Sequence, residues 1–411
     1  MTEDPAGTPP AAPQDLPDFR SREFLLGHVR DTLAFYTPRA FDPRGGFFHF
    51  YRDDGTVYDR DTRHLVSSTR FVFDFAMAFR HFGEADHLHA VRHGVRYLRE
   101  QHRDPETGGY AWVRTGDRVI DGTNHCYGLA FVLLAYAHAL QAGIREARSW
   151  IDETVDVMER RFWLPDAGLY ADEATADWVT RSPYRGQNAN MHACEAMLAA
   201  FDATGDPAFL SRACTLAQNI TMKQAALADG LVWEHYREDW SIDWDYHRDD
   251  PGNLFRPWGF QPGHQTEWAK LLLILDRHAG RLDGDASWLV PRAVALFDAA
   301  VERAWDARHG GIAYGFAPDG SICDGNKYHW VQAESLAAAA LLATRTGDVR
   351  YLDWYDRLWA YCWTHFVDHR HGAWYRILGP DNRKLTDEKS PAGKVDYHNM
   401  GACYEVLHAF G

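Results

Sequence analysis

The sequence lacks the features that mark export, membrane insertion and nucleic-acid binding. Its opening residues contain neither a basic segment nor an apolar segment, so no signal peptide is predicted. The longest aliphatic run, Leu271 to Leu275, is far too short to span a bilayer. No basic stripe interrupts a formal net charge of −15, which would repel a polyphosphate backbone. We therefore expect a cytoplasmic protein with no nucleic-acid or membrane partner.

Cysteine and the common cofactor motifs are also scarce. The sequence has no C-x-x-C pair, no H-E-x-x-H motif, no G-x-G-x-x-G run and no Walker loop. Metal ligands could still converge from distant parts of the chain, but no ligand set is apparent, and no metal is predicted. The six cysteines lie in apolar stretches and are predicted to be reduced core residues; they are Cys126, Cys194, Cys214, Cys323, Cys362 and Cys403.

What the sequence does contain is a short tail and a long, aromatic remainder. Residues 1–17 are acidic and rich in proline and alanine, which predicts a disordered tail. Residues 18–411 are predicted to form a single catalytic domain. Aromatic residues make up 14% of the chain, a share that suits either sugar-stacking surfaces or a large core.

A glycine turn followed by aromatic residues occurs six times. Successive glycines are 63, 59, 62, 81 and 61 residues apart, and a period near sixty indicates a repeat architecture. The repeated glycines are Gly46, Gly109, Gly168, Gly230, Gly311 and Gly372. In each repeat a short strand is expected after the glycine, and two helical patterns follow it.

The two helices of a repeat differ in composition. The first is apolar on all sides, as in the alanine-rich run after Ser335, whereas the second is amphipathic, as in the run after Trp150. Such pairs can stack into an open solenoid or close into a ring, and no repeat resembles a polar cap. We therefore predict an all-α (α/α)6 barrel of six inner and six outer helices, with short β-hairpins at one end.

Closure would bring the first residues of all six inner helices to one end of the barrel. Polar residues at these positions cost stability unless they are hydrogen-bonded or serve a function. We therefore expect them to form one cavity. These residues are Arg70, His125, Tyr127, Asn188, His192, His264, Glu267, Trp330, Glu334 and His398.

His264 carries the clearest chemical signal. Glu267 follows it by three residues on the same helical face, where its carboxylate could orient the imidazole. Histidine suits the transfer of a carbon-bound proton near neutral pH, and a second histidine is available in His398. The 81-residue interval holds an insertion, Tyr236 to Gly263, directly before His264, and this loop is predicted to be a lid or a specificity element.

Other functions fit parts of this pattern. Glu267 and Glu334 could serve as the paired carboxylates of a glycoside hydrolase, a reaction that helical barrels can also host. A barrel that only binds a sugar or a protein is a further alternative, and in that case substitution of His264 would change no activity.

Three runs of the sequence resemble the N-acylglucosamine 2-epimerase superfamily, and within it the branch of mannose-specific aldose–ketose isomerases. They are Phe255-Arg-Pro-Trp-Gly-Phe-Gln-Pro-Gly-His-Gln-Thr-Glu-Trp, Gln187-Asn-Ala-Asn-Met-His-Ala-Cys-Glu and Lys394-Val-Asp-Tyr-His. The resemblance implies an (α/α)6 barrel that works without metal or nicotinamide. Gln261-Pro-Gly-His stands where the cellobiose 2-epimerases would have a different run, which argues against a disaccharide substrate.

The same resemblance implies roles for individual residues. His264 and His398 would be the acid/base catalysts, with Glu267 beside His264, and Arg70 would bind the sugar oxygens at the reacting end. The sugar-binding shell would comprise Tyr127, Asn188, His192, Glu267, Trp330 and Glu334.

These observations predict an isomerase that interconverts D-mannose and D-fructose. Removal of the C2 proton from an open-chain aldose gives an enediolate, which Arg70 would stabilise. Return of the proton to C1 gives the ketose, and return to the other face of C2 gives the epimer, so a D-mannose/D-glucose 2-epimerase stays open. A sulfonated sugar such as sulfoquinovose also stays open, because Arg248 and Arg256 could bind an anion. The expected partner is a monosaccharide, and the sequence allows either a monomer or a small homo-oligomer.

Overall fold

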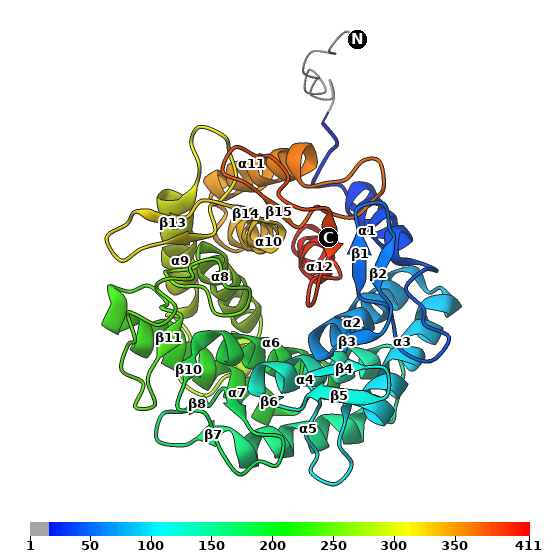
Figure 1. Cartoon of the computed structure of the whole chain (residues 1–411). Coiled ribbons are helices and arrows are strands. Elements are labelled where there is room, and N and C mark those ends of the chain that lie inside the picture. The colour runs from blue at the N-terminus through cyan, green and yellow to red at the C-terminus, as the bar shows by residue number, and fades with distance from the viewer. Residues whose placement is uncertain (1–15) are drawn as a thin grey trace, which may run out of the picture.

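The structure, a computed structural model, describes residues 16–411, so most of the predicted disordered tail, residues 1–15, lies outside the described residues. Within the described range twelve α-helices form two concentric rings (Figure 1). The inner helices are α2 (Leu65–Phe82), α4 (Cys126–Gln141), α6 (Gln187–Thr204), α8 (Pro262–Asp276), α10 (His329–Thr346) and α12 (Tyr397–Phe410). The outer helices are α1 (Arg22–Tyr36), α3 (Ala85–Tyr97), α5 (Ala147–Arg161), α7 (Pro207–Gln218), α9 (Leu289–Ala304) and α11 (Val349–His365).

The inner ring is closed. Each inner helix contacts the next, and α12, at the C-terminus, packs against both α10 and α2. Figure 1 shows the red end of the chain beside the blue helices near the N-terminus. The predicted (α/α)6 barrel is therefore confirmed, and the open solenoid is excluded.

A repeated turn connects inner to outer helices. In Thr204-Gly205-Asp206 and in Thr346-Gly347-Asp348, the glycine is left-handed (φ 73° and 72°) and ends the inner helix. The following aspartate accepts a hydrogen bond from the backbone N–H two residues on and so caps the outer helix. This local chemistry reverses the chain and lays each outer helix against its inner partner.

The opposite connections, from outer to inner helices, carry the short strands. They are arranged as β16–β1–β2 (Glu388–Ser390, Phe50–Arg52, Val57–Asp59), β3–β4–β5 (Thr62–His64, Val113–Thr115, Arg118–Asp121), β6–β9 (Asn124–His125, Glu173–Ala174), β7–β8 (Trp163–Leu164, Leu169–Tyr170), β10–β11 (Arg185–Gly186, His235–Tyr236), β12–β13 (Gly315–Phe316, Ile322–Asp324) and β14–β15 (Lys327–Tyr328, Ile377–Leu378). All of these pairs are antiparallel, and several join one repeat to the next, as β6–β9 and β14–β15 do.

The glycine turns are less strand-like than the sequence predicted. In most repeats the turn makes one isolated bridge, such as Phe41 with Phe47 or Trp305 with Ile312. At Gly230 no such bridge forms within residues 16–411, because α7 continues into a π-helical turn (Asn219–Gln224) and a 3-10 turn (Ala225–Ala228). These tight turns reverse the chain after each outer helix, and the short strands then lead to the next inner helix.

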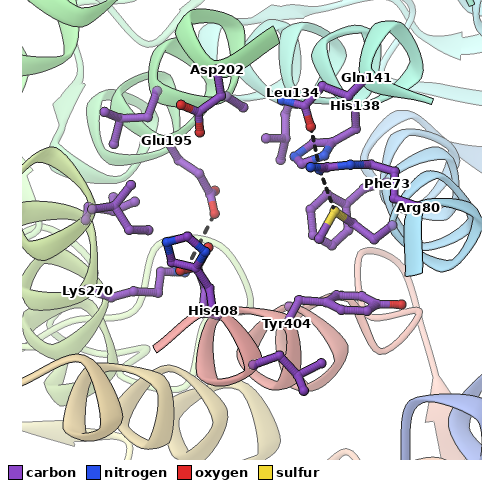
Figure 2. Close-up of a pocket in the computed structure, with 18 of the residues that line it drawn as sticks. Phe73, Arg80, Leu134, His138, Gln141, Glu195, Asp202, Lys270, Tyr404 and His408 are labelled. Atoms are coloured by element: carbon purple, nitrogen blue, oxygen red, sulfur yellow. Dashed lines mark hydrogen bonds and ion pairs between the residues drawn. The ribbon is translucent and has the colours of Figure 1, made fainter. Parts of the chain in front are cut away.

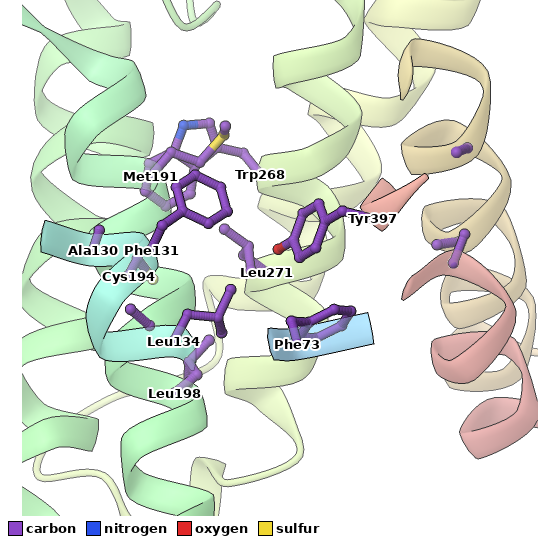
Figure 3. Close-up of a cluster of buried hydrophobic side chains, with 14 of the residues drawn as sticks. Phe73, Ala130, Phe131, Leu134, Met191, Cys194, Leu198, Trp268, Leu271 and Tyr397 are labelled. Atoms are coloured by element: carbon purple, nitrogen blue, oxygen red, sulfur yellow. The ribbon is translucent and has the colours of Figure 1, made fainter. Parts of the chain in front are cut away.

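The core lies between the rings and along the barrel axis. The inner helices contribute small buried faces, such as Ala337 to Ala340 of α10, which let neighbouring helices approach closely. Larger side chains from four inner helices, including Phe73, Phe131, Trp268 and Tyr397, meet across the axis (Figure 3). This apolar layer packs against the polar residues at the N-terminal ends of the inner helices.

Two sequence expectations are refined by the described residues. Four cysteines are buried and free, but Cys214 and Cys323 are only half-buried, and Cys323 lies in a strand. Between residues 16 and 411 no helix combines the length and apolarity that membrane crossing requires.

Candidate active site

The N-terminal ends of the inner helices surround a cavity of about 90 Å³. Eight of the ten residues expected to meet here line it: Arg70, Tyr127, Asn188, His192, His264, Glu267, Trp330 and His398. Glu334 does not line it and lies behind His398. His125 does not line the cavity, since it ends strand β6 and pairs with Glu173 at 3.4 Å. The barrel therefore brings together residues from all six repeats.

His264 is held by a carboxylate that sequence reasoning did not identify. Its Nδ1 lies 2.9 Å from Glu234 Oε2, which also accepts a hydrogen bond from Gln187 Nε2 at 2.9 Å. Gln187 is fixed in turn by Trp268, whose Nε1 donates to its Oε1 at 2.7 Å. The expectation that Glu267 orients His264 is thus wrong. Glu267 follows His264 by three residues on α8, but the carboxylate bonded to His264 Nδ1 is that of Glu234, which precedes the insertion.

His398 has a matching partner. Its Nδ1 lies 2.6 Å from Glu334 Oε1, and Glu334 Oε2 forms an ion pair with Lys270 Nζ at 2.6 Å. Glu334 was expected in the sugar-binding shell, but it faces His398 and Lys270. Burial, followed by the positive charge of Arg70, holds the pKa of His398 well below the usual value for histidine.

The start of α12 fixes the position of His398. Val395 and Asp396 both have left-handed backbones, with φ of 35° and 55°. The Asp396 carboxylate is bonded to Lys394 Nζ at 2.7 Å and to the Tyr36 hydroxyl. Such backbone conformations are costly for residues other than glycine, and they persist where surrounding contacts hold them.

The indole of Trp330 lies close to both His264 and His398. The ring of Trp330 lies 4.9 Å from that of His264 and 5.8 Å from that of His398, measured between centroids. In both histidines Nδ1 faces a carboxylate, so Nε2 is the nitrogen available to the cavity. The site therefore presents the Nε2 atoms of two imidazoles to one small cavity.

Arg70 reaches the cavity from α2. Its guanidinium donates to the Gly393 carbonyl and, at 3.4 Å, to the Tyr127 hydroxyl. It also lies over the rings of Phe131 and Tyr397, at 4.5 and 4.6 Å from their centroids. No carboxylate within residues 16–411 forms a salt bridge with Arg70, so its charge remains available to a bound anion or a developing oxyanion.

Glu267 has a different environment from the one expected. Neither of its carboxylate oxygens has a hydrogen-bond partner among residues 16–411. Burial, followed by the negative charge of Glu334, raises the pKa of the Glu267 carboxyl well above its usual range. A protonated Glu267 at the cavity wall can donate a hydrogen bond to a sugar oxygen.

Two clusters of polar side chains at the site have the spacing of metal ligands. Among the described residues, two groups have ligand atoms within 4.8 Å of one another: His192, Glu195 and Glu267, and Glu267, Glu334 and His398. Lys270 Nζ, however, lies 2.6 Å from Glu334, 3.6 Å from Glu195 and 4.0 Å from Glu267. An ammonium at this point already supplies positive charge and would repel a metal ion. The donor set fits a lysine counter-ion better than a metal.

The insertion before His264 forms part of the cavity wall. Leu254, Phe255 and Pro257 line it, and the Phe255 ring stacks on His64 with centroids 5.7 Å apart. The two arginines considered for anion binding are directed elsewhere. Arg256 pairs with Glu173 at 2.6 Å, and Arg248 pairs with Asp245, with its side chain 68% exposed. This removes the observation that favoured a sulfonated sugar.

Several residues of the site were missed in the sequence. Glu234 follows the fourth glycine turn, Glu195 follows His192 by three residues, and His329 is the neighbour of Trp330. Glu195 and Lys270 lie one helical turn beyond predicted residues, at i+3 from His192 and Glu267. That spacing was the available signal for both, whereas Glu234 required knowledge of the turn.

A second, larger cavity of about 780 Å³ opens at the other end of the barrel. It is framed by the C-terminal ends of the inner helices and lined by residues such as Arg80, Gln141 and Asp202 (Figure 2). Glu195, Lys270 and Glu334 form the wall that separates this rear cavity from the histidine pair. The glycoside hydrolase alternative is weakened, because Glu334 belongs to that wall and does not line the histidine cavity.

Comparison with known proteins gives one consistent result. The sequence profile of the N-acylglucosamine 2-epimerase family matches residues 46–402. A D-mannose isomerase of Marinomonas mediterranea is 57% identical over 392 residues, which cover 95% of this chain and 98% of the relative. A D-mannose isomerase of Thermobifida fusca is 41% identical over 290 residues, or 70% of each chain.

Solved structures agree. The crystal structure of a D-mannose isomerase superposes with a TM-score of 0.93 at 56% identity and covers 96% of this chain and 100% of its own. Cellobiose 2-epimerase from Bacillus thermoamylovorans superposes with a TM-score of 0.81 at 20% identity, covering 94% and 99%. The latter likeness concerns the fold alone.

Proposed function

The chain belongs to the N-acylglucosamine 2-epimerase family, and from this premise we propose that it is an aldose–ketose isomerase that interconverts D-mannose and D-fructose. The 57% identity to a D-mannose isomerase over nearly the full length of both chains supports this substrate. The proposed catalytic unit is the barrel of residues 18–411, and the proposed partner is a monosaccharide. No metal or nicotinamide takes part in the proposed reaction.

The observation that carries the proposal is the pair of histidines. His264 and His398 each present Nε2 to one cavity, and each is backed by a buried carboxylate at Nδ1. A carboxylate at Nδ1 fixes the tautomer and stabilises the imidazolium that forms when Nε2 takes a proton. Two such groups around one small molecule suit proton transfer to and from carbon.

The reaction then follows from the arrangement. The two histidines open the sugar ring as acid and base, and one of them removes the C2 proton. Negative charge develops on the oxygens at C1 and C2, and the guanidinium of Arg70, which has no salt bridge within residues 16–411, stabilises this enediolate. Return of the proton to C1 and transfer of the O2 proton complete D-fructose.

The remaining residues of the cavity position the sugar. Trp330 contacts both imidazoles and offers an apolar face, while Tyr127, Asn188, His192 and Glu267 offer polar atoms. Phe255 and its loop form part of the cavity lining. Its small volume suits one monosaccharide better than a disaccharide.

2-Epimerisation would use the same residues, because only the carbon that receives the proton differs. The two outcomes are separated by incubating the protein with D-mannose and analysing the products by NMR. We expect fructose as the product, and substantial glucose at early times would favour the epimerase instead.

His264→Asn and His398→Asn test the catalytic pair. Each should lower turnover by at least 100-fold, since general acid/base catalysis contributes about 10²- to 10⁴-fold. Circular dichroism and a thermal melt check that each variant is folded. His125→Asn is the matched control, because His125 lies at the same end of the barrel outside the cavity, and it should keep wild-type turnover. Wild-type turnover in a folded His264→Asn or His398→Asn protein would remove that residue from the mechanism.

A further inference from the structure

The wall between the two cavities holds more negative than positive side chains. Glu334 is buried in this wall and Glu195 is half-buried there, with the buried Glu267 beside them. Lys270 is the only lysine or arginine within residues 16–411 that forms a salt bridge with any of the three. Three carboxylates around one ammonium cannot all ionise without cost. The positive charge of Lys270 therefore favours the ionised carboxylates and lowers the number of protons that they hold.

The wall is connected to both sides of the site. Glu334 joins Lys270 to His398, with 2.6 Å at each contact. Glu195 joins Lys270 to His192 Nδ1 at 3.0 Å and to the Tyr397 hydroxyl at 2.7 Å. Lys270 itself does not line the histidine cavity, so it cannot touch a bound sugar.

We propose that Lys270 is a positioning residue for the isomerisation, which acts through Glu334 to set the protonation of His398. The proposal rests on the proposed function for its kinetic test, but its charge argument concerns the free protein. Lys270 takes the place that a metal ion occupies in other carboxylate clusters, and it supplies the cluster with a fixed positive charge.

The direction of the effect follows from electrostatics. Burial raises the pKa of the Glu334 carboxyl, and Lys270 opposes that rise. Lys270 also contributes to the lowered pKa of His398, after burial and the charges of Arg70 and His192. Loss of the ammonium would therefore raise the pKa of both groups. The charged and titratable groups that face His398 and Lys270 are Arg70, His192, Glu195, Glu267, His329, Glu334, Lys394 and Tyr397.

Lys270→Met removes the charge and keeps most of the side-chain length. We expect the acid limb of the pH profile of kcat/KM to move to higher pH by about one unit or more, which at a fixed pH on that limb is a loss of about tenfold. Lys270→Arg should keep the limb near its wild-type position, because the larger guanidinium can extend into the rear cavity. Arg80→Met is the matched control: Arg80 also lines the rear cavity, but it bonds to Gln141 and Met77 instead of the wall (Figure 2).

A second variant, with the opposite effect on the charge of the wall, keeps the proposal testable if Lys270→Met does not fold. Glu195→Gln removes a negative charge from the same wall, so the acid limb should move to lower pH. A purely structural role for Lys270 would lower kcat or stability in these variants without moving the limb. Unmoved limbs in both Lys270→Met and Glu195→Gln would overturn the proposal.

A second readout needs no substrate. The ring resonances of His398, identified by their loss in His398→Asn, report its titration in the free protein by NMR. The His398 titration should move to higher pH in Lys270→Met and stay in place in Arg80→Met. If the wild-type protein does not convert mannose, the proposed function fails, and this titration still decides the inference about Lys270.

Discussion

Glu234→Gln tests the His264 pair with almost no change of shape. The substitution removes the negative charge that faces His264 Nδ1 and replaces one carboxylate oxygen with an amide nitrogen. Gln187 Nε2 donates to the same oxygen, Oε2, that binds His264. The new amide must therefore keep an oxygen at that position, and the His264 tautomer is retained.

This geometry sets the expected loss of kcat in Glu234→Gln. A hydrogen bond to a charged group contributes about 1.5–3 kcal/mol and a neutral one about 1 kcal/mol. The difference, about 1–2 kcal/mol, falls on the step in which His264 becomes an imidazolium, so kcat should drop roughly 5- to 30-fold. The amide nitrogen would occupy the site of Glu234 Oε1, which has no partner in the described structure, and this should lower the thermal midpoint as well.

The assay is steady-state conversion of mannose, with kcat and KM measured separately. Asp202→Asn is the control, because Asp202 pairs with His278 at 3.2 Å at the rear of the barrel. It should leave kcat unchanged. A folded Glu234→Gln protein with wild-type kcat would refute the role given to this pair. A loss above 1,000-fold would show that the tautomer had changed and that Gln187 does not hold the amide as described.

Three further predictions concern charge and protonation. Arg70→Ala should lower kcat more than it raises KM, because the guanidinium is proposed to stabilise the enediolate; a change in KM alone would place Arg70 in ground-state binding. Incubation with EDTA followed by desalting should leave turnover unchanged, since Lys270 supplies the positive charge in the carboxylate cluster, and loss of activity that Mn²⁺ or Zn²⁺ restores would argue for a metal. Burial lowers the pKa of His28 to about 4, so the unfolded chain binds more protons between pH 6.5 and 4, and the free energy of unfolding should fall by up to about 3 kcal/mol from this residue as the pH drops through that window. His28→Gln, which keeps an acceptor for Trp374 Nε1, should have a flatter pH dependence of its thermal midpoint, and an unchanged dependence would exclude this contribution.

The barrel could be predicted from the sequence because its signals are periodic. Glycine turns near every sixtieth residue mark the repeats, and the contrast between the alanine-rich run after Ser335 and the charged run after Trp150 separates inner from outer helices. Once the ring closes, the starts of the inner helices must meet. This explains why eight predicted residues line one cavity, although they span Arg70 to His398.

The partners of the catalytic residues could not be predicted in the same way. Helical spacing suggested that Glu267 holds His264, but the hydrogen bond comes from Glu234, in the turn that precedes the insertion. Helical spacing describes contacts along one helix, whereas the Nδ1 atoms of His264 and His398 face neighbouring segments. Helical spacing could have paired Lys270 with Glu267 on α8, but not with Glu195 of α6 or Glu334 of α10.

Incubation of D-mannose with the protein in deuterated water tests most directly whether two imidazoles act on one sugar carbon. NMR of the products follows the label. The account predicts that deuterium enters C1 of fructose and C2 of recovered mannose, and that neither His264→Asn nor His398→Asn gives exchange above the protein-free rate. Fructose that stays free of deuterium at C1 even after prolonged incubation, or exchange at the wild-type rate in either variant, would contradict it.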